Sequence, residues 1–592
     1  MINPDLALRM VRESPVIAFD TETSGLTVAD LVCGWVITDK DNSVYVPVRH
    51  KEGGNIPNAT EFERELNSAF ASRHLNGHRT VGHHLGFDLR AALRHGVEIR
   101  GPLEDTMINE ALIDDRTIGY SLEDCANRWK VETKKGAAIY AELARRFGGL
   151  PTSKQMQHFH KVAGDDPIVV EYAVGDGIST LQLWERQQGR LDEDDLRRVW
   201  KLECDLLPYL ARMHSRGLKV DMSQAEIVLD DIATAVDKAQ KAFPQDFNPR
   251  SPKDVENLFR ANGFSDANFS KTEKGAISFT EKWLTTNDIG KAILGIRRME
   301  KARDAFITPL IDTHNFAGRV HPVLNQSKSD DYGVAGARLS CTDPNLQAYP
   351  KRNIDIGRIV RRLIIPDEEM ILEEADAKQQ EPRLFTHYSG QPELVEGYRN
   401  GTMDMHDRAA EILGIDREVA KRLGMGMLTM MSVPTLAVHM GWTTDQAKSA
   451  HDAFLGVAFP DIGDFQVTAV QKFRRVGYVK TMLGRRAYCA EPKFAYRGVS
   501  RLIQNNGGDH IKLCMLRANQ YEDAHPEVEV LLSIHDSLMW QRDPAHEPTE
   551  LLKAVENVAD EMGLIVPIPF GLGSGPDWAR ASYGNKLDSY EE

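Results

Sequence analysis

The chain has 592 residues, of which 42% are hydrophobic and 27% are charged, and its formal net charge is −15. The length predicts roughly three or four domains, and the composition fits a soluble multidomain enzyme. The sequence contains no run of about 18 apolar residues, so no membrane span is expected, and the N-terminus lacks the layout of a secretory signal. The six cysteines are scattered without a CxxC pair, which argues against a zinc site or a disulfide framework and for a reducing, cytoplasmic compartment.

The negative net charge, taken alone, argues mildly against nucleic acid as a partner. The charges are unevenly distributed, however, and residues 338–362 hold six basic side chains against two acidic ones. Such a patch is consistent with a solvated surface and equally with a site that binds a polyanion.

Residues 1–190 have the pattern of an α/β unit. Apolar, β-branched runs at 16–19, 32–37 and 44–48 predict three strands that follow closely on one another. Helical patterns follow from about residue 60 onward.

The remaining chain alternates between helical and mixed segments. Residues 191–310 are helical and highly charged, 311–395 combine short strands with loops, and 396–500 are again helical and rich in Met and basic residues. Residues 501–592 return to α/β, with a strand–turn–strand pattern from Val528 to Trp540.

Four carboxylates in the first 190 residues have a spacing that suggests metal chemistry. Asp20 and Glu22 stand at the end of the first predicted strand, where alternation of side chains projects both to the same face. Asp88 lies near a predicted helix start, and Asp176 lies on a helix with Tyr172 one turn before it on the same face. Hard oxygen ligands of this kind suit Mg²⁺ or Mn²⁺.

In order and spacing, these segments resemble the three motifs of the DEDDy 3′→5′ proofreading exonucleases, which have an RNase H-like fold. The resemblance covers about residues 10–185. It implies hydrolysis with two metal ions held by the four carboxylates, while the hydroxyl of Tyr172 orients the attacking water. One departure is His84, four residues before Asp88, where the family usually has an Asn that holds the substrate or lies beside it.

A second set of resemblances begins at residues 338–350, Arg-Leu-Ser-Cys-Thr-Asp-Pro-Asn-Leu-Gln-Ala-Tyr-Pro. This segment resembles a long and specific stretch of the DNA polymerase I family, also called family A. The resemblance implies that Arg338 and Gln347 contact the minor-groove side of the primer–template end. Readout in the minor groove is degenerate, which suits an enzyme that accepts every base pair.

A predicted strand at 371–376 delivers Asp376, and the segment after it resembles motif A of the same family. Asp376, Gln379, Glu381 and Arg383 match the motif. The resemblance implies that Asp376 holds both catalytic metals and that Glu381 excludes a ribose 2′-OH by its bulk. Gln379 and Arg383 are expected at the substrate site.

Arg417, Lys421 and Met425 are spaced i, i+4 and i+8 and would share one face of a helix. Arg417 and Lys421 match motif B, whose cations neutralise the incoming triphosphate. His406 lies in an earlier segment that also resembles the family. The helix departs from the family at Met425 and Thr429, where aromatic residues are usual, so the family's sugar discrimination does not transfer directly to this helix.

Residues 531–537 resemble motif C. The resemblance implies that Asp536 is the second metal-binding carboxylate, close to Asp376, and that His535 lies near the primer terminus. Ser537 replaces a Glu of the family, and Gln504 matches a further substrate position.

Taken together, the resemblances imply a multidomain α/β and α+β fold. An RNase H-like exonuclease at 1–190 would precede a right-hand polymerase with its thumb at 191–310, its fingers at 396–500 and its palm at 311–395 and 501–592. The implied function is template-directed synthesis of DNA from a primer 3′ end with dNTPs, by two-metal phosphoryl transfer, together with 3′→5′ proofreading. Each active site would hold two Mg²⁺ ions, or Mn²⁺ in their place.

The compact length resembles that of phage-type replicative polymerases, here expected to act as a monomer on primer–template DNA in the host cytoplasm, without a membrane. Contacts with a helicase, a primase or a single-stranded-DNA-binding protein stay open. One alternative is an exonuclease whose polymerase half has become a DNA-binding platform, favoured by Ser537 and by the substitutions in motif B. Another is an RNA-processing nuclease of the RNase D type, which fits residues 1–185 but leaves the later motifs unexplained.

Overall fold

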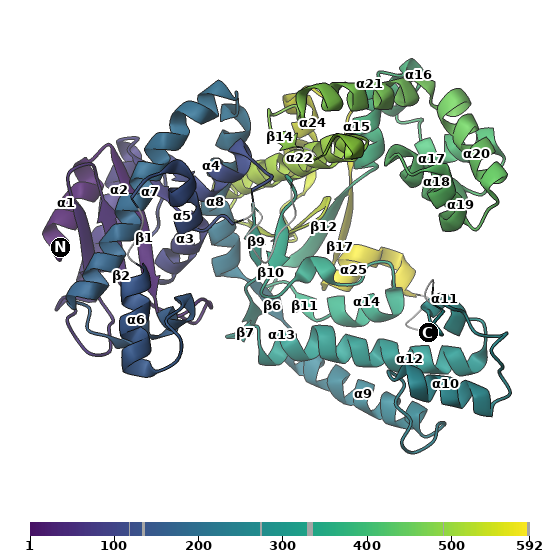
Figure 1. The fold of residues 1–592 in the computed structure, drawn as a ribbon, viewed down its shortest axis with the longest axis horizontal. Coiled ribbons are helices and arrows are strands. Elements are labelled where there is room, and N and C mark those ends of the chain that lie inside the picture. Colours follow the sequence, from purple (N-terminus) through teal and green to yellow (C-terminus); the bar gives the residue numbers. More distant parts are fainter. Residues whose placement is uncertain (118, 133–135, 273–274, 328–335, 489–490, 589–592) are drawn as a thin grey trace.

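The computed structural model describes residues 1–117, 119–132, 136–272, 275–327, 336–488 and 491–588. An N-terminal unit lies to the left in Figure 1, and a sheet containing β12 (Ile371–Ala377) and β17 (Phe570–Gly575) lies near the centre. Two helical arms extend to the right, one above and one below. Among the helices described, none combines the length and the apolar character that a membrane crossing requires. The five described cysteines are buried and unpaired, and Cys489 lies outside the described residues.

The N-terminal unit is built on a five-stranded sheet with the order β3-β2-β1-β4-β5, in which β1 is antiparallel to β2 and parallel to β4. The three strands predicted from apolar runs are confirmed. Helices cover both faces of this sheet. On one face α7 (Pro167–Glu193) contacts the first four strands, and on the other face α3 (Leu85–Arg94) packs against β1. The strands are β1 (Val16–Thr23), β2 (Val32–Thr38), β3 (Ser43–Pro47), β4 (Arg79–Gly82) and β5 (Leu103–Asp105).

A long helix, α8 (Arg197–Arg216), connects this unit to the rest of the molecule. It packs against α3 on one side and against α22 (Arg497–Ala524) and β15 (Val528–Ile534) on the other. Its buried residues recur at helical spacing, as in Val199, Leu202 and Leu206, so a continuous apolar stripe fixes the helix in place.

The central sheet is antiparallel with the order β15-β16-β12-β17. A two-residue turn of His535 and Asp536 joins β15 to β16 (Ser537–Arg542), which confirms the predicted strand–turn–strand. His535 has a φ of 57°, as such a tight turn requires. The other two strands are β12 (Ile371–Ala377) and β17 (Phe570–Gly575).

The two arms are helical. The lower arm has its own core of aromatic side chains around Phe259 and Trp283 and consists of α9 (Met222–Gln240), α10 (Pro252–Ala261), α11 (Glu281–Leu284) and α12 (Asp288–Ala302). The upper arm consists of α17 (Met405–Leu413), α18 (Arg417–Leu428), α19 (Val433–Met440) and α20 (Thr444–Ala453). Both arms flank the central sheet (Figure 1).

The predicted unit boundaries do not coincide with the ends of helices or strands. The positions 190, 310, 395 and 500 fall inside α7, α13 (Thr308–Asp312), α16 (Pro392–Arg399) and α22. Within the segment expected to be the thumb, α8 packs on the central sheet. In the same segment, β6 (Leu218–Val220) pairs outside the arm with β8 (Arg319–Val320) and β11 (Ile364–Ile365). A helical pattern shows that a segment is helical but not which unit it packs against.

Two candidate active sites

Three of the predicted carboxylates meet in the N-terminal unit. Asp20 and Glu22 project from β1, and Asp176 approaches from α7, with ligand oxygens that all lie within 4.8 Å of one another. Glu22 and Asp176 are buried. Negative charges held this close repel unless a cation lies among them, and all-oxygen ligands suit Mg²⁺. The donor set therefore fits a divalent cation.

The fourth predicted ligand, Asp88, faces another partner. Thr21, whose side chain points to the opposite face of β1 from Asp20 and Glu22, donates to Asp88 Oδ1 from its backbone N–H at 2.9 Å and from its hydroxyl at 2.6 Å. Burial raises the pKa of Asp88 to about 7, against the lowering effect of these two hydrogen bonds. The structure thus brings three of the four carboxylates together and places the fourth behind β1.

Tyr172 lies beside the three clustered carboxylates, one helical turn before Asp176 on α7. Its side chain is buried, and burial together with the negative charge of Asp176 and Glu22 raises the pKa of the phenol well above its usual value. The hydroxyl therefore stays protonated and can donate a hydrogen bond to a water at the cluster.

His84 occupies the residue before α3, with a φ of 62° and an exposed side chain. Its backbone N–H donates to Asp105 Oδ1 at 2.9 Å, and the N–H of Leu85 donates to Asp105 Oδ2 at 2.8 Å. Asp105 is a buried residue that the sequence analysis did not select. Its only local signal is its place at the start of α4 (Thr106–Ile113), where it caps the helix.

In the C-terminal part of the chain, the central sheet brings Asp376 and Asp536 side by side. Asp376 on β12 is in register with Ser537 on β16, and the N–H of Ala377 donates to the backbone oxygen of Asp536 at 3.1 Å. Burial and the negative charge of Asp376 raise the pKa of Asp536. Two acids that affect each other in this way form a donor pair suited to a divalent cation.

Lys351, from a neighbouring segment, contacts one of these two acids, Asp376. Its Nζ lies 2.7 Å from Asp376 Oδ2 and 2.8 Å from Glu374 Oε1, and Ser537 donates to Asp376 Oδ2 at 3.0 Å. Burial opposes its charge, but Glu374 and Asp376 together raise the pKa of Lys351. In the sequence Lys351 is one cation of the basic patch at 338–362, and the structure pairs it with Asp376, a predicted metal ligand.

Four further residues were predicted at the substrate site, namely Arg338, Gln347, Gln504 and His535. Arg338 forms an ion pair with Glu381 at 3.0 Å. Gln347 donates to the backbone oxygen of Ser533 at 3.0 Å and so holds β15 just before its turn. His535 is exposed in that turn, and Gln504 is half-buried on α22.

Helix α18 presents Arg417, Lys421 and Met425 as an exposed stripe, which confirms the predicted shared face. Arg417 is paired with Asp404 at 2.8 Å and with Asp407 at 2.6 Å. Thr429 ends the helix and donates its hydroxyl to the backbone oxygen of Met425 at 2.8 Å.

Three residues expected at the substrate site are engaged inside the protein. Gln379 donates to Asp404 at 2.7 Å, and His406 is buried at the start of α17. Arg383 is also buried, and it donates to the backbone oxygens of Lys378 at 3.0 Å and Pro567 at 2.6 Å. Arg383 therefore holds the turn that follows Asp376.

Comparison with known proteins covers both halves. Residues 220–580 match DNA polymerase family A, and residues 4–192 match a 3′-5′ exonuclease family. The chain is 28% identical to DNA polymerase DpoZ of Acinetobacter phage SH-Ab 15497, over 98% of this chain and 99% of that protein. It is 29% identical to DNA polymerase DpoZ of Salmonella phage PMBT28, over 97% and 98%. It is also 27% identical to DNA polymerase I of Chloroflexus aurantiacus, over 98% of this chain but 62% of that protein.

The fold is similar to a solved structure described as the POL domain of Pol1 from M. smegmatis in complex with DNA primer-template and dNTP. The TM-score is 0.78 at 21% identity, covering 98% of this chain and 99% of that one. Together with the two family matches, this similarity confirms the expected exonuclease fold followed by a polymerase fold. Because the family match extends over more than half of its length, the chain belongs to DNA polymerase family A and is a DNA-directed DNA polymerase with an N-terminal 3′-5′ exonuclease domain.

Proposed function

We propose that Asp376 and Asp536 form the centre for DNA synthesis and that Asp20, Glu22 and Asp176 form the centre for removal of mismatched 3′ ends. The observation that carries this assignment is the separation of the acids into two groups, one beside the N-terminal sheet and one at the end of the central sheet. The full-length similarity to phage polymerases supports a replicative role for a phage in its host's cytoplasm.

At both centres the residues fit Mg²⁺, with Mn²⁺ as a substitute, and we assign two ions to each. When bound, such ions lower the pKa of the attacking hydroxyl or water and stabilise the charge of the transition state. At the excision centre, the hydroxyl of Tyr172 orients the attacking water, and His84 is exposed where it can contact the 3′ end. Asp88 completes the proposed ligand set once its carboxylate turns from Thr21.

At the synthesis centre, the stripe on α18 supplies the cations for the incoming triphosphate. Lys421 is exposed on that stripe, and Arg417 can exchange Asp404 and Asp407 for phosphate oxygens, because such exposed ion pairs are worth about 1 kcal/mol or less. Glu381, fixed by Arg338, limits the space beside the sugar. The proposed ligands are primer–template DNA and dNTPs, the two that the Pol1 structure is described as holding.

Reciprocal substitutions test the assignment. Asp20→Ala is expected to lower 3′ excision by at least about a hundredfold while primer extension with dNTPs and Mg²⁺ continues, and Asp376→Ala should do the reverse. The expected size is that seen when one group that stabilises transition-state charge is removed. Asp41→Ala, which changes an exposed aspartate in the turn between β2 and β3, is the matched control and should leave both activities unchanged.

Two outcomes would contradict the proposal. Absence of extension by the Asp20→Ala protein would favour the alternative in which the polymerase half only binds DNA. Parallel loss of both activities in either variant would mean that the two acid groups do not form separate centres.

A further inference from the structure

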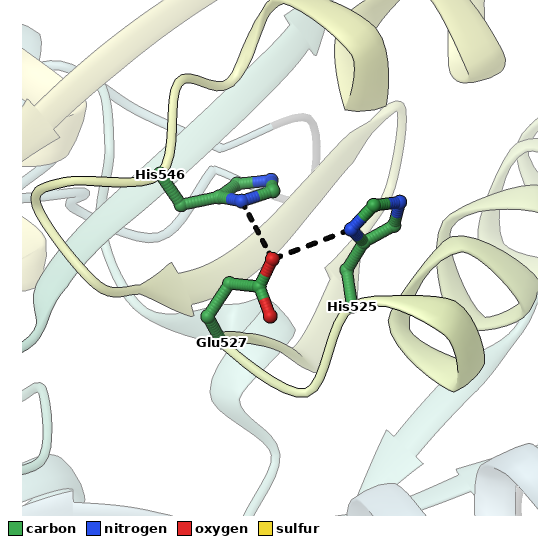
Figure 2. Close-up of side chains that lie close together, drawn as sticks. All are labelled: His525, Glu527 and His546. Carbon is green, nitrogen blue, oxygen red and sulfur yellow. Dashed lines mark hydrogen bonds and ion pairs between the residues drawn. The ribbon is translucent and has the colours of Figure 1, made fainter.

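Three side chains converge at the end of the central sheet that lies away from Asp536. They are His525, Glu527 and His546, and their ligand atoms all lie within 4.8 Å of one another (Figure 2). His525 follows the last residue of α22, Glu527 lies just before β15, and His546 lies in the loop after β16. Because the seven residues of β15 rise about 3.3 Å each, this cluster is roughly 20 Å from the catalytic turn.

The backbone on both sides of the cluster is fixed by hydrogen bonds. Val528 pairs with Arg542 in the sheet, which brings the two chain segments together. The N–H of Asp543 donates to the oxygen of Glu527 at 3.0 Å, and the N–H of His546 donates to the oxygen of Asp543 at 3.0 Å. The arrangement therefore does not depend on the side chains alone.

Both imidazole rings direct the same nitrogen at the same oxygen. His546 Nδ1 lies 2.8 Å and His525 Nδ1 lies 3.3 Å from Glu527 Oε1, as Figure 2 shows. The other ring nitrogen of His546, Nε2, lies 3.0 Å from the hydroxyl of Tyr521. The ring of Tyr521 also stacks on that of His525, with 4.1 Å between the ring centroids. Metal-binding histidines commonly have such a partner on the second nitrogen, because it fixes the ring and its tautomer.

We propose that His525, Glu527 and His546 bind one divalent transition-metal ion, for which Zn²⁺ is the best fit, with water completing the coordination. Two imidazole nitrogens and one carboxylate oxygen are a ligand set of open zinc sites. Mg²⁺ prefers oxygen ligands throughout, so this site would be distinct in chemistry from both active sites. The scattered cysteines argued against zinc, but this site needs no thiolate.

Such an ion would join the end of α22 to the loop after β16. The pairing of β15 with β16 brings these two segments together. The ion would thus clamp the outer end of the hairpin whose inner end bears Asp536. The three side chains are only partly buried, which leaves access for the ion and for a coordinating water.

The test uses the full chain without an affinity tag, stripped of metal by a chelator and then held in a large excess of Mg²⁺. Co²⁺ is titrated as a spectroscopic probe, followed by Zn²⁺. We expect one Co²⁺ per chain with the visible absorption of a low-symmetry site, displaced by Zn²⁺. His525→Ala and His546→Ala should each weaken binding by about tenfold or more, since even loss of an outer partner costs roughly 10–100-fold.

Two further variants separate ligation from folding. Tyr521→Phe keeps all three ligands and should weaken Co²⁺ binding about tenfold through the lost contact to His546. His451→Ala changes a half-exposed histidine paired with Asp452 in the upper arm and should bind Co²⁺ as the parent does. Primer extension confirms that each variant is folded. Equal Co²⁺ binding by the parent and a His525→Ala/His546→Ala double variant, or absence of binding by the parent, would overturn the proposal.

Discussion

The proposed excision and synthesis centres differ in the groups that surround their carboxylates. In the excision centre, Asp20, Glu22 and Asp176 lie within 4.8 Å of one another, with Tyr172 beside them. In the synthesis centre, Asp376 is already paired with Lys351 at 2.7 Å. The first site therefore gathers three carboxylates, while in the second a lysine lies against one of two.

This difference follows from what each site receives. A single-stranded 3′ end brings one scissile phosphate to the excision centre, so the protein must supply most of the charge that holds the cations. A dNTP brings its own three phosphates, which are themselves cation ligands. We therefore expect the excision centre to bind cations without substrate more tightly than the synthesis centre does.

Both centres are joined through α8, which packs against α3 and α22, and Glu203 on α8 gives the largest predicted effect. Glu203 is buried and pairs with Lys512 Nζ at 2.6 Å and with Arg485, which also binds Asp509 at 2.7 Å. Glu203→Ala would leave two buried cations with one carboxylate and should reduce the free energy of unfolding by about 3–5 kcal/mol. The midpoint of denaturant unfolding measures the loss.

The control for this prediction is Glu550→Ala, which removes an exposed partner of Lys553 and should leave the midpoint unchanged.

The network also predicts a pH dependence. Burial raises the pKa of Glu203, but the charges of Lys512 and Arg485 outweigh it and hold that pKa below its usual value. The stability from Glu203 is then complete above about pH 4.3 and is lost as the pH falls through the lowered pKa. Unchanged acid stability in Glu203→Ala would contradict this role.

The local parts of this architecture could be predicted from the sequence, and the long-range contacts could not. β-Branched runs located β1, β2 and β3, and the spacing of Arg417, Lys421 and Met425 predicted a shared helix face. These features depend on neighbours in the chain. Glu203 and Lys512, by contrast, meet across 309 positions, and no local pattern selects one buried carboxylate for one buried lysine.

The same limit applies inside the candidate sites. The motif resemblances identified Asp376 and Asp536, and the sheet register places them side by side. The contact of Lys351 with Asp376 was not foreseen, because a lysine in a basic patch has the same pattern whether it is solvated or paired. Nor could a motif show that Thr21, which lies between Asp20 and Glu22, donates a hydrogen bond to Asp88 on the opposite face of β1.

Asp88 provides the next largest test of the comparison. Asp88→Asn keeps the shape of the side chain and can still accept from Thr21, but it removes the negative charge. If a fourth carboxylate is needed to hold the cations, excision should fall about a hundredfold. Primer extension should be unchanged, which makes it the internal control. Normal excision by this variant would show that the three clustered carboxylates suffice and that Asp88 only positions β1.

A substitution of Lys351 tests cation binding at the proposed synthesis centre, where a smaller effect is expected. Lys351→Ala removes the cation that neutralises Asp376, while Glu374 keeps the indole N–H of Trp578 at 2.9 Å and so remains satisfied. The Mg²⁺ concentration that half-saturates primer extension should fall about fivefold, since a partly exposed ion pair is worth about 1 kcal/mol. Half-saturation of excision should not change. A higher Mg²⁺ requirement for extension would show that Lys351 assists cation binding instead of opposing it.

The smallest expected effect concerns the nucleotide helix, where this chain departs most from its family. Met425 is 40% exposed on the same stripe as Lys421, and the hydroxyl of Thr429 is committed to the backbone of α18. An incoming nucleotide would therefore meet a flexible thioether where an aromatic ring is usual. Met425→Phe should lower the KM for dNTPs about threefold, because a rigid ring adds a stacking contact of about 0.5–1.5 kcal/mol. Steady-state extension measures it, with excision as the control. A raised KM would mean that the stripe on α18 packs the nucleotide through the slender Met side chain and has no room for a ring.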